Sequence, residues 1–600
     1  MTTGYVIMPR EKRGKHLCFH QPFLMDATSL VLGASFALAI SLVVYQVGKP
    51  TPLPLIPHNK LKWFVGDIPF LTKMATEKGA ITYAFDDTAT RLGPVSQVVV
   101  GLGASWASRI FGFGQAIVIL ADSQEMHDVL VNRATEFDRS KSISALFAGT
   151  LPQGMLALPT DDQFKHHKRY LGITMTNPYL ARMTPRIVDL MQELVDLWSV
   201  GAKRLGSSST DVIDVLNDIR LATIDVIASI TFGTSFNGVR MSLDFLEATP
   251  IAAPSERPEI PKLAADLEVL LDTIGDGVLF PAPSFLPWLT RNFNRKWRKA
   301  IMSTHDYLRG RLYAARAEYV SEGRESEKAA ANQADNVLDM ILEREKEDRA
   351  KGTETLSEAE LIDELTTFAL GGSETTATTM QWSVKMLCKH PDVQRKLRAE
   401  LLTNLPAIAA RPPTFAEISD EANLPYLSAV MYEILRCSRT AAAVARDTTR
   451  DTVLLGYPIP KGTQVLMPIG MVQQMESDGA KDVTDGLDAV RSASSKQRRR
   501  TGYWSAKDVH AFNPERWLRA DGTFNPNAGP WLPFSFGFRG CFGQKLALIE
   551  LRLFLSMIQV NFFFDAIPEE LNTWKCHETV TNHPQQCYIR PIPWESMEKL

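Results

Sequence analysis

The hydrophobic pattern of the chain begins with an uncharged apolar run over residues 27–47, which follows an N-terminal segment of residues 1–26. At roughly 1.5 Å rise per residue, a helix of this length crosses the roughly 30 Å hydrocarbon core of a membrane. The run therefore predicts a transmembrane anchor. A cleaved signal peptide is the alternative, but its apolar stretch is usually only about 7 to 15 residues long and ends in a small-residue cleavage site.

Residues 48–60 contain four prolines. Proline cannot continue a helix and stiffens an extended segment, so these residues are predicted to be a linker. No break in composition divides residues 61–600, which predicts one large domain after the linker.

Apolar residues at helical spacing predict long helices over residues 185–350, broken at the proline-rich stretches 249–261 and 280–287. These breaks are expected near a substrate pocket. Two further helical runs cover residues 361–389 and 545–560.

Residues 453–468 alternate apolar and turn residues in the manner of hairpin strands. Residues 322–355 are charged and lack aromatic side chains, which favours a solvated helix and loop. Residues 475–502 are biased toward Asp, Ser and basic residues and are predicted to be a disordered surface insert. A membrane or reductase contact is the alternative for this insert. Together these patterns predict a mainly α fold with small β-sheets.

Composition narrows the function classes. The formal net charge is -3, so there is no basic bias toward nucleic acid, and no nucleic-acid partner is expected. The six cysteines are scattered without paired spacing, which argues against a disulfide framework or a zinc site and favours a reducing compartment.

Cys541 stands in a setting that a plain core does not require. It lies between Gly540 and Gly543, with Gly537 and Arg539 upstream and a helical run directly after it. Unpaired N–H groups and the partial positive charge at a helix N-terminus lower a thiol pKa. Cys541 is therefore predicted to be an anion.

An anionic sulfur on a glycine-lined loop suits the axial ligand of a haem iron. Glycines let the backbone lie close to a flat macrocycle, and an arginine can reach a propionate. The alternative is a buried free cysteine, the commonest fate of a lone cysteine.

The pattern Phe534, Gly537, Arg539, Cys541 and Gly543 resembles the haem-binding signature of the cytochrome P-450 family. The resemblance implies the mainly helical haem-thiolate fold, with haem b held through the Cys541 thiolate. It also implies a monooxygenase that inserts one atom of O₂ into an apolar small molecule.

The run ALGGSETTATT within residues 361–389 is similar to the distal helix of that family. The resemblance implies that Gly371 and Gly372 leave room for dioxygen beside the iron. It implies that Thr375 holds the bound oxygen by a hydrogen bond and that Glu374 helps to relay protons from solvent. A simple helix kink is the alternative for these residues.

The family's propionate contacts are only partly matched. Phe164 and Lys168 stand where the family has a Trp-x-x-x-Arg pattern. Lys168 can still pair with a carboxylate as a point charge, and His167 is a neighbouring candidate. Arg446 is a further candidate. A solvated basic helix face and a surface arginine are the alternatives.

Glu433 and Arg436 are three residues apart, and Arg516 follows in the segment FNPERW. By themselves the first two predict a surface ion pair of little energetic weight. In the resembled family the three positions form a buried network that locks the segment beneath the haem. Such a network makes the loss of any member severe.

The electron source is expected outside this chain. The glycine-rich segments 101–103 and 112–114 lack the following helix start of a dinucleotide-binding motif. A membrane flavoprotein reductase that uses NADPH is the implied donor, and membrane lipid is an expected contact.

Microsomal members of the family imply a single-pass protein of the endoplasmic reticulum with a cytosolic catalytic domain. The charges do not clearly support this orientation, since basic residues both precede and follow residues 27–47.

The substrate is not written in any motif. By family analogy, residues 147–158 and 440–444 line an apolar pocket. The wording FNPNAGPWLPFSFG looks like fungal members that tailor secondary metabolites, which favours a terpenoid, polyketide or alkaloid scaffold. Two alternatives remain: a haem-thiolate isomerase or dehydratase that needs no reductase, and a non-catalytic haem sensor.

Overall fold

The computed structural model describes residues 35, 38, 45, 49–100, 115–206, 211–249, 261–279, 293–321, 334–472, 487–497, 502, 504 and 508–597. The predicted anchor, residues 27–47, lies outside this part of the chain apart from three isolated positions. Among the residues that are described, no helix is both long and apolar enough to span a membrane.

Helices make up most of the described chain. Their bounds are α2 Ile68–Lys78, α3 Thr82–Leu92, α5 Ser123–Val131, α6 Lys141–Ala148, α7 Asp162–Leu171, α8 Asn177–Ala202, α9 Leu216–Phe232, α10 Gly238–Ala248, α11 Lys262–Leu279, α13 Arg295–Ser321, α14 Val337–Ala350, α15 Glu358–Lys389, α16 Pro391–Asn404, α17 Phe415–Ser419, α18 Pro425–Ser438, α19 Ile469–Val472, α21 Ala493–Gln497, α22 Gln544–Asn561 and α23 Trp594–Met597. The helices predicted over 361–389 and 545–560 correspond to α15 and α22, within three residues at each end.

The strands are short and form small sheets. Their bounds are β1 Val95–Val100, β2 Gln115–Leu120, β3 Phe137–Arg139, β4 Ile213–Asp214, β5 Val444–Thr448, β6 Thr452–Leu454, β7 Tyr457–Ile459, β8 Gln464–Met467, β9 Phe562–Phe564, β10 Cys576–Glu578, β11 Asn582–Pro584, β12 Tyr588–Ile589 and β13 Pro591–Pro593. The largest described sheet has the order β1-β2-β8-β5-β3, with β2 and β8 parallel. The remaining strands pair two by two, including the hairpins β6-β7 and β10-β11.

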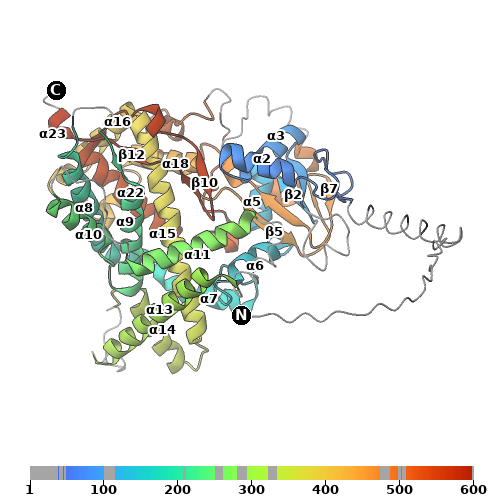
Figure 1. Cartoon of the computed structure of the whole chain (residues 1–600), viewed down its shortest axis with the longest axis horizontal. Helices are drawn as coiled ribbons and strands as arrows, with labels where there is room; N and C mark the ends of the chain where they lie inside the picture. Colours follow the sequence, from blue (N-terminus) through green and yellow to red (C-terminus); the bar gives the residue numbers. More distant parts are fainter. Residues whose placement is uncertain are drawn as a thin grey trace, which may run out of the picture.

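Most of the helices lie on one side of the molecule and the largest sheet lies on the other. In Figure 1 the helices α8, α9, α16 and α22 gather on one side, and the largest sheet with α2 and α3 lies on the other. Helix α15 runs between them (Figure 1). It begins at a capping box in which Ser357 and Glu360 satisfy each other's backbone N–H groups, so its start is fixed by local sequence.

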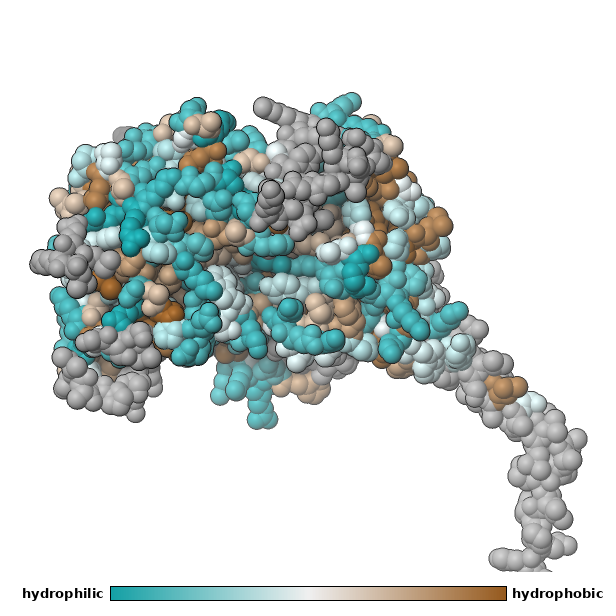
Figure 2. Space-filling view, turned by 90° about the horizontal axis from the view of Figure 1, so that it is seen from above, coloured by the Kyte–Doolittle hydropathy of each residue, from teal (hydrophilic) through white to brown (hydrophobic). Residues whose placement is uncertain are grey.

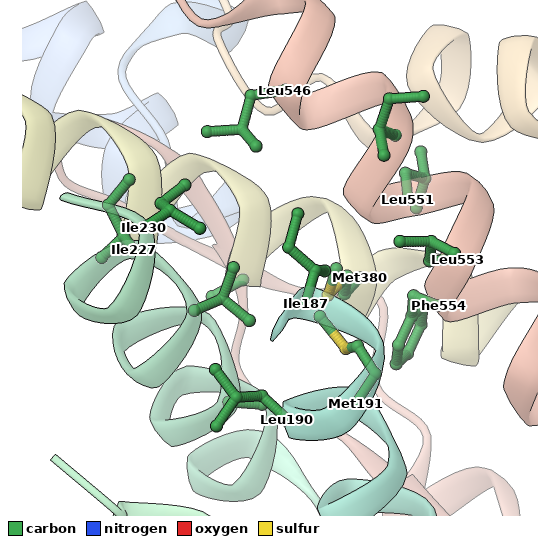
Figure 3. Close-up of a cluster of buried hydrophobic side chains, with 14 of the residues drawn as sticks. Ile187, Leu190, Met191, Ile227, Ile230, Met380, Leu546, Leu551, Leu553 and Phe554 are labelled. Carbon is green, nitrogen blue, oxygen red and sulfur yellow. The ribbon is translucent and has the colours of Figure 1, made fainter. Parts of the chain in front are cut away.

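The main core is formed where α8, α9, α15 and α22 meet (Figure 3). Each helix contributes apolar side chains to the cluster, and those that Figure 3 labels are Ile187, Leu190, Met191, Ile227, Ile230, Met380, Leu546, Leu551, Leu553 and Phe554. Burial of one such side chain stabilises the fold by about 1.5–3 kcal/mol. The cluster therefore holds α15 rigidly against α22, the helix that follows Cys541.

The helical region over residues 185–350 has more breaks than its periodicity predicted. Helix α8 ends at Ala202, and α9 ends at Phe232, where Gly233 adopts a positive φ of 73°. The predicted breaks at 249–261 and 280–287 lie mostly outside the described residues. Helix α14, predicted to be solvated, buries Leu338 and Ile341 in the main core, so that interpretation of its surface was wrong.

Part of the predicted disordered insert is ordered. Residues 487–497 pack against α5, where the Arg491 guanidinium pairs with Asp122 and the Ser492 hydroxyl donates to Asp128 at 2.6 Å. These buried charge contacts hold a segment that composition alone marked as solvated. The other residues of the insert, apart from Gly502, lie outside the described chain.

Candidate active site

The loop before α22 is folded so that Cys541 precedes the helix directly. The Cys541 N–H donates to the Phe534 carbonyl at 2.8 Å, and the Gly540 N–H donates to the Gly537 carbonyl at 3.0 Å. Gly537 has φ 74°, and a Cβ there would lie 2.0 Å from the Leu130 carbonyl oxygen. Only glycine fits this approach to α5, so the loop geometry depends on Gly537.

Cys541 retains exposed surface, although protein surrounds it closely enough for burial to raise its pKa. Burial outweighs the hydrogen bonds from the Gly543 and Gln544 N–H groups and the charge of Lys168, which all lower the thiol pKa. The predicted lowering was wrong for the free thiol, because desolvation exceeds the helix-terminus effect. Metal coordination removes this obstacle, since a coordinating thiol is deprotonated outright.

Helix α15 passes beside the cysteine loop. The rings of Phe368 and Phe542 meet edge to face with centroids 5.8 Å apart. One turn later, Gly371 is exposed within a mostly buried helix, and a Cβ there would meet no atom within 4 Å. A Cβ on Gly372 would lie 2.5 Å from Cδ1 of Ile227. Only Gly371 faces open space, whereas Gly372 permits close packing of α9.

Thr375 and Glu374 point to different surroundings. The half-buried Thr375 donates its hydroxyl to the Gly371 carbonyl at 2.7 Å. Glu374 is buried and pairs through Oε1 with His583 Nε2, while the Thr581 hydroxyl donates to the same oxygen at 3.3 Å. Burial raises the pKa of Glu374, but the hydrogen bond and charge of His583 outweigh it, so the pKa is lowered.

His583 was missed by sequence reasoning. It belongs to the β10-β11 hairpin, about two hundred residues further along the chain than Glu374. A single histidine in a short strand belongs to no local pattern, and no signal in the sequence links it to Glu374.

Three arginines converge beside the cysteine loop. Arg139 and Arg446 are direct partners in the register of β3 and β5. Burial and the charge of Arg539 lower the pKa of Arg139 to about 9 and that of Arg446 to about 10. Burial also lowers the pKa of Arg539 to about 10, an effect that the charges of Asp138 and Asp161 only partly offset. The cluster therefore carries excess positive charge.

This excess of charge fits the acidic edge of a haem. The Nε atom of Arg139 is buried without a hydrogen-bond partner. The Arg446 guanidinium donates a hydrogen bond to the carbonyl of the adjacent residue, Ala445, at 2.9 Å. A buried unpaired cation is costly unless an anion is supplied. The propionates of a haem held through Cys541, as the resemblance implies, would supply such an anion. Arg139 was not predicted, because its position depends on the pairing of distant strands.

Helix α7 adds aromatic and basic groups to the same place. The Arg539 guanidinium carbon lies 3.9 Å from the Phe164 ring centroid, a cation–π contact. Lys168 donates to the Phe538 carbonyl, and its Nζ lies 4.6 Å from the Phe538 ring centroid. Phe164 stands where the family pattern has tryptophan, and its ring packs against the Arg539 guanidinium.

The structure places His167 away from this cluster. Its Nδ1 contacts Glu364 Oε1 at 2.7 Å and its Nε2 contacts Glu360 Oε1 at 3.1 Å. Burial lowers the pKa of His167, but these two carboxylates outweigh it, so the pKa is raised. With both ring nitrogens engaged by α15, His167 is not available to a propionate, and the predicted role was wrong.

Residues 147–158 were predicted to line the pocket, and the loop formed by residues 151–158 of this stretch is fastened on two sides. Its Gln153 and Met155 N–H groups donate to the carboxylates of Asp363 and Glu364 on α15, at 2.7 and 2.8 Å. Its carbonyls accept from the arginine cluster: Met155 and Leu158 from Arg539, and Leu156 from Arg139. The loop is therefore held between α15 and the cationic edge of the site.

The predicted glutamate–arginine network is present in the geometry. Glu433 and Arg436 are both fully buried and form a bidentate pair with N–O distances of 2.8 Å. Arg516 Nε donates to Glu433 Oε1 at 3.0 Å, and Trp517 Nε1 donates to Oε2 at 2.9 Å. Every oxygen of this carboxylate has a charged or N–H partner. The network ties α18 to the segment that leads to the cysteine loop.

Comparison with known proteins agrees with this geometry. The family model "Cytochrome P450" matches residues 104–477 and 496–590. The gap between the two matched ranges falls inside the predicted insert. The matched part contains the cysteine loop, α15 and the buried carboxylate network.

Several fungal proteins are similar over nearly the whole chain. Cytochrome P450 monooxygenase GME11363 of Pestalotiopsis microspora is 28% identical, covering 95% of this chain and 99% of its own. Cytochrome P450 monooxygenase TRI13 of Fusarium sporotrichioides is 28% identical, covering 91% and 96%. Cytochrome P450 monooxygenase xilC of Penicillium crustosum is 26% identical, covering 94% and 96%.

The family implies a haem-thiolate iron, electrons supplied by a reductase, and a small organic substrate. The cysteine ahead of α22, the cationic edge and the helix that crosses beside them are what such a cofactor requires. With a family match over most of its length, the chain belongs to the cytochrome P450 family and is a monooxygenase.

Proposed function

We propose that this protein oxidises an apolar small molecule in fungal secondary metabolism, at a terpenoid, polyketide or alkaloid scaffold. The observation that carries the proposal is the position of the Cys541 loop beside α15, where Phe542 packs against Phe368 one turn before Gly371, with the arginine cluster next to the loop. The similarity to monooxygenases from several fungi supports the proposal that the substrate is a fungal metabolite.

In this proposal, Cys541 would hold the haem iron through its thiolate, and Arg446, Arg539 and Lys168 would pair with the propionates. Phe534, Gly537 and Gly543 shape the loop that holds the sulfur in place. The haem, when bound, activates dioxygen, and thiolate donation favours O–O cleavage. The role of this chain is to hold the cofactor, exclude water from the buried edge and supply protons from the α15 side.

The experiment that tests the proposal is to feed candidate fungal extracts to membranes that contain this protein and a reductase. The expected result is a product heavier by one oxygen atom that requires NADPH. The Cys541→Ser variant in the same membranes is the matched control. Turnover without NADPH would instead favour an isomerase or dehydratase.

Electrons are proposed to come from NADPH through a separate flavoprotein reductase. The sequence offers no dinucleotide-binding motif of its own. The reductases that serve microsomal members of the family are membrane proteins. The proposed donor therefore also requires this protein to lie at a membrane, with its catalytic domain in the cytosol.

Membrane attachment through residues 27–47 is likewise a proposal. It is supported by exposed apolar side chains near the linker, where Leu55 is 79%, Trp63 50% and Phe64 44% exposed. Hydrophobic residues are visible at this end of the molecule in Figure 2. Aromatic and apolar groups at such a place suit the interface of a single-pass protein of the endoplasmic reticulum.

Deletion of residues 1–48 is expected to weaken membrane association while the haem spectrum stays intact, because the anchor adds no ligand to the domain. Flotation with liposomes measures the first effect and the reduced carbon monoxide spectrum the second. The matched control is deletion of residues 1–26 alone, which keeps the apolar run. Loss of haem in the longer deletion would show that the anchor belongs to the fold.

Thr375→Ala is expected to keep haem and the carbon monoxide spectrum but to raise hydrogen peroxide released per NADPH by about twofold or more. Without the hydroxyl, oxygen is poorly held, and protonation at the wrong atom releases peroxide. The matched control is Thr366→Ala, because Thr366 makes the same kind of bond, to the Ile362 carbonyl at 2.7 Å. An unchanged peroxide yield would make Thr375 a packing residue.

A further inference from the structure

The β10-β11 hairpin brings a titratable group to the buried face of α15. His583 of β11 contacts the Thr378 hydroxyl through Nδ1 at 3.0 Å, so its ring is fixed from one side by α15. Its Nε2 pairs with Glu374 Oε1. Figure 1 shows the hairpin beside α15. The imidazole therefore joins the hairpin to the acidic residue that directly precedes Thr375.

Hydroxyl groups surround this pair. Thr581 contacts His583 Nε2 at 3.1 Å, Thr378 at 3.1 Å and Glu374 at 3.3 Å, and Thr579 contacts Nε2 at 3.2 Å. Such a set of donors and acceptors stabilises either position of a proton between the imidazole and the carboxylate. The site is thus suited to proton exchange rather than only to fixing the hairpin.

Protons can reach the pair from outside. The His583 side chain is 19% exposed, in contrast to 8% for Glu374. On its other side, Glu374 lines a small pocket between α9, α11 and α15. Arg220 of α9 and Glu268 of α11 form an ion pair at this pocket. Glu374 therefore contacts the histidine and also lines this pocket.

We propose that His583 and Glu374 form a proton-transfer pair that supplies the Thr375 side of α15. The inference rests on the proposed function and assigns a positioning residue to it. The Nε2–H bond of the imidazolium breaks as an O–H bond forms on Glu374. The carboxyl then gives this proton to water on the Thr375 side and returns to the carboxylate, and the imidazole takes a new proton from a solvent water, which leaves hydroxide. The electrons come from the reductase and none passes through the pair.

The charged groups that face the pair come from its neighbouring elements. Arg220 of α9 acts on Glu374 and is itself paired with Glu268 of α11. Glu578 of β10 faces the other way, where its carboxylate accepts from the Thr82 N–H at 3.2 Å. His577 of β10 is exposed and is the register partner of His583. It provides a matched control on the same hairpin.

The test compares His583→Gln, His583→Ala and His577→Gln, with dioxygen, NADPH and a reductase and no organic substrate. Glutamine can donate a hydrogen bond to Glu374 but cannot carry a proton. We expect His583→Gln to raise peroxide per NADPH about twofold or more. His577→Gln behaves like the wild type.

Thermal unfolding provides a readout that does not depend on turnover. His583→Ala is expected to lower Tm, and His583→Gln to recover most of that loss, because glutamine restores the contact of the hairpin with α15. A glutamine variant that recovers both Tm and the wild-type peroxide yield would overturn the inference and leave only a structural tie.

The two levels of the proposal fail differently. A wild-type protein with the red-shifted carbon monoxide band, beside a His583→Gln variant with an unchanged peroxide yield, overturns the inference alone. A wild-type protein that lacks that band overturns the proposed function, and the inference falls with it.

Discussion

Cys541→Ser is expected to abolish the red-shifted Soret band of the reduced carbon monoxide complex and with it all NADPH-dependent product formation. A neutral alcohol cannot replace the thiolate as donor to the iron. The geometry of the loop also fixes the sulfur. The backbone N–H of Cys541 donates to the Phe534 carbonyl at 2.8 Å, and the backbone N–H groups of Gly543 and Gln544 donate to the sulfur. The measurement is the difference spectrum of the reduced protein with and without carbon monoxide.

Cys437→Ser is the matched control, because Cys437 is a further thiol in the main core region that contacts the Arg436 guanidinium at 3.2 Å. Burial raises its thiol pKa to about 12, so it is not an anion under ordinary conditions. The Cys437 variant is expected to keep the band. A Cys541 variant that keeps the band would remove this residue from the site.

Glu433→Gln is expected to prevent stable folding with haem. The change keeps the shape of the side chain but leaves Arg436 and Arg516 without their common anion. Breaking a buried ion pair on one side costs about 3–5 kcal/mol, which is a large fraction of a typical stability of about 5–15 kcal/mol. The measurement is the yield of soluble protein with haem, together with Tm.

Glu515→Gln is the control for this variant. Glu515 lies in the same short segment as Arg516, but its side chain is 51% exposed and pairs with Lys396 at the surface. Exposed pairs contribute about 0–1 kcal/mol, so this variant is expected to fold and bind haem normally. Equal losses of haem-containing protein and of Tm in Glu433→Gln and Glu515→Gln would show that burial is not what makes the network important for stability.

The local features of the site could be predicted from the sequence. The cysteine loop and the helix after it depend on neighbouring residues, so their pattern is readable. The same holds for α15, whose start is marked by a capping box. Glu433 and Arg436 lie on one helix, although their burial came from the resemblance and not from their spacing.

Features that depend on distant pairing could not be predicted. Arg139 joins the cationic edge because β3 pairs with β5 in one register, and His583 reaches Glu374 because a late hairpin lies on α15. The sign of the Cys541 pKa shift was also wrong, because desolvation depends on how the whole chain encloses the sulfur. His167 was assigned to the wrong neighbours, because its contacts with Glu360 and Glu364 depend on how α7 packs against the distant α15.

The fastening of residues 151–158 has a consequence for any attempt to change the specificity of this enzyme. The loop binds through its carbonyls the same guanidinium groups that face the cofactor edge, and through its amides the acids of α15. By reciprocity, whatever effect a bound anion at those guanidiniums has on the order of the loop, the order of the loop has the same effect on retention of the anion. The pocket wall and the grip on the cofactor are therefore one thermodynamic unit. Engineering of this loop for a new substrate alters haem retention at the same time, and libraries at residues 151–158 need selection for both.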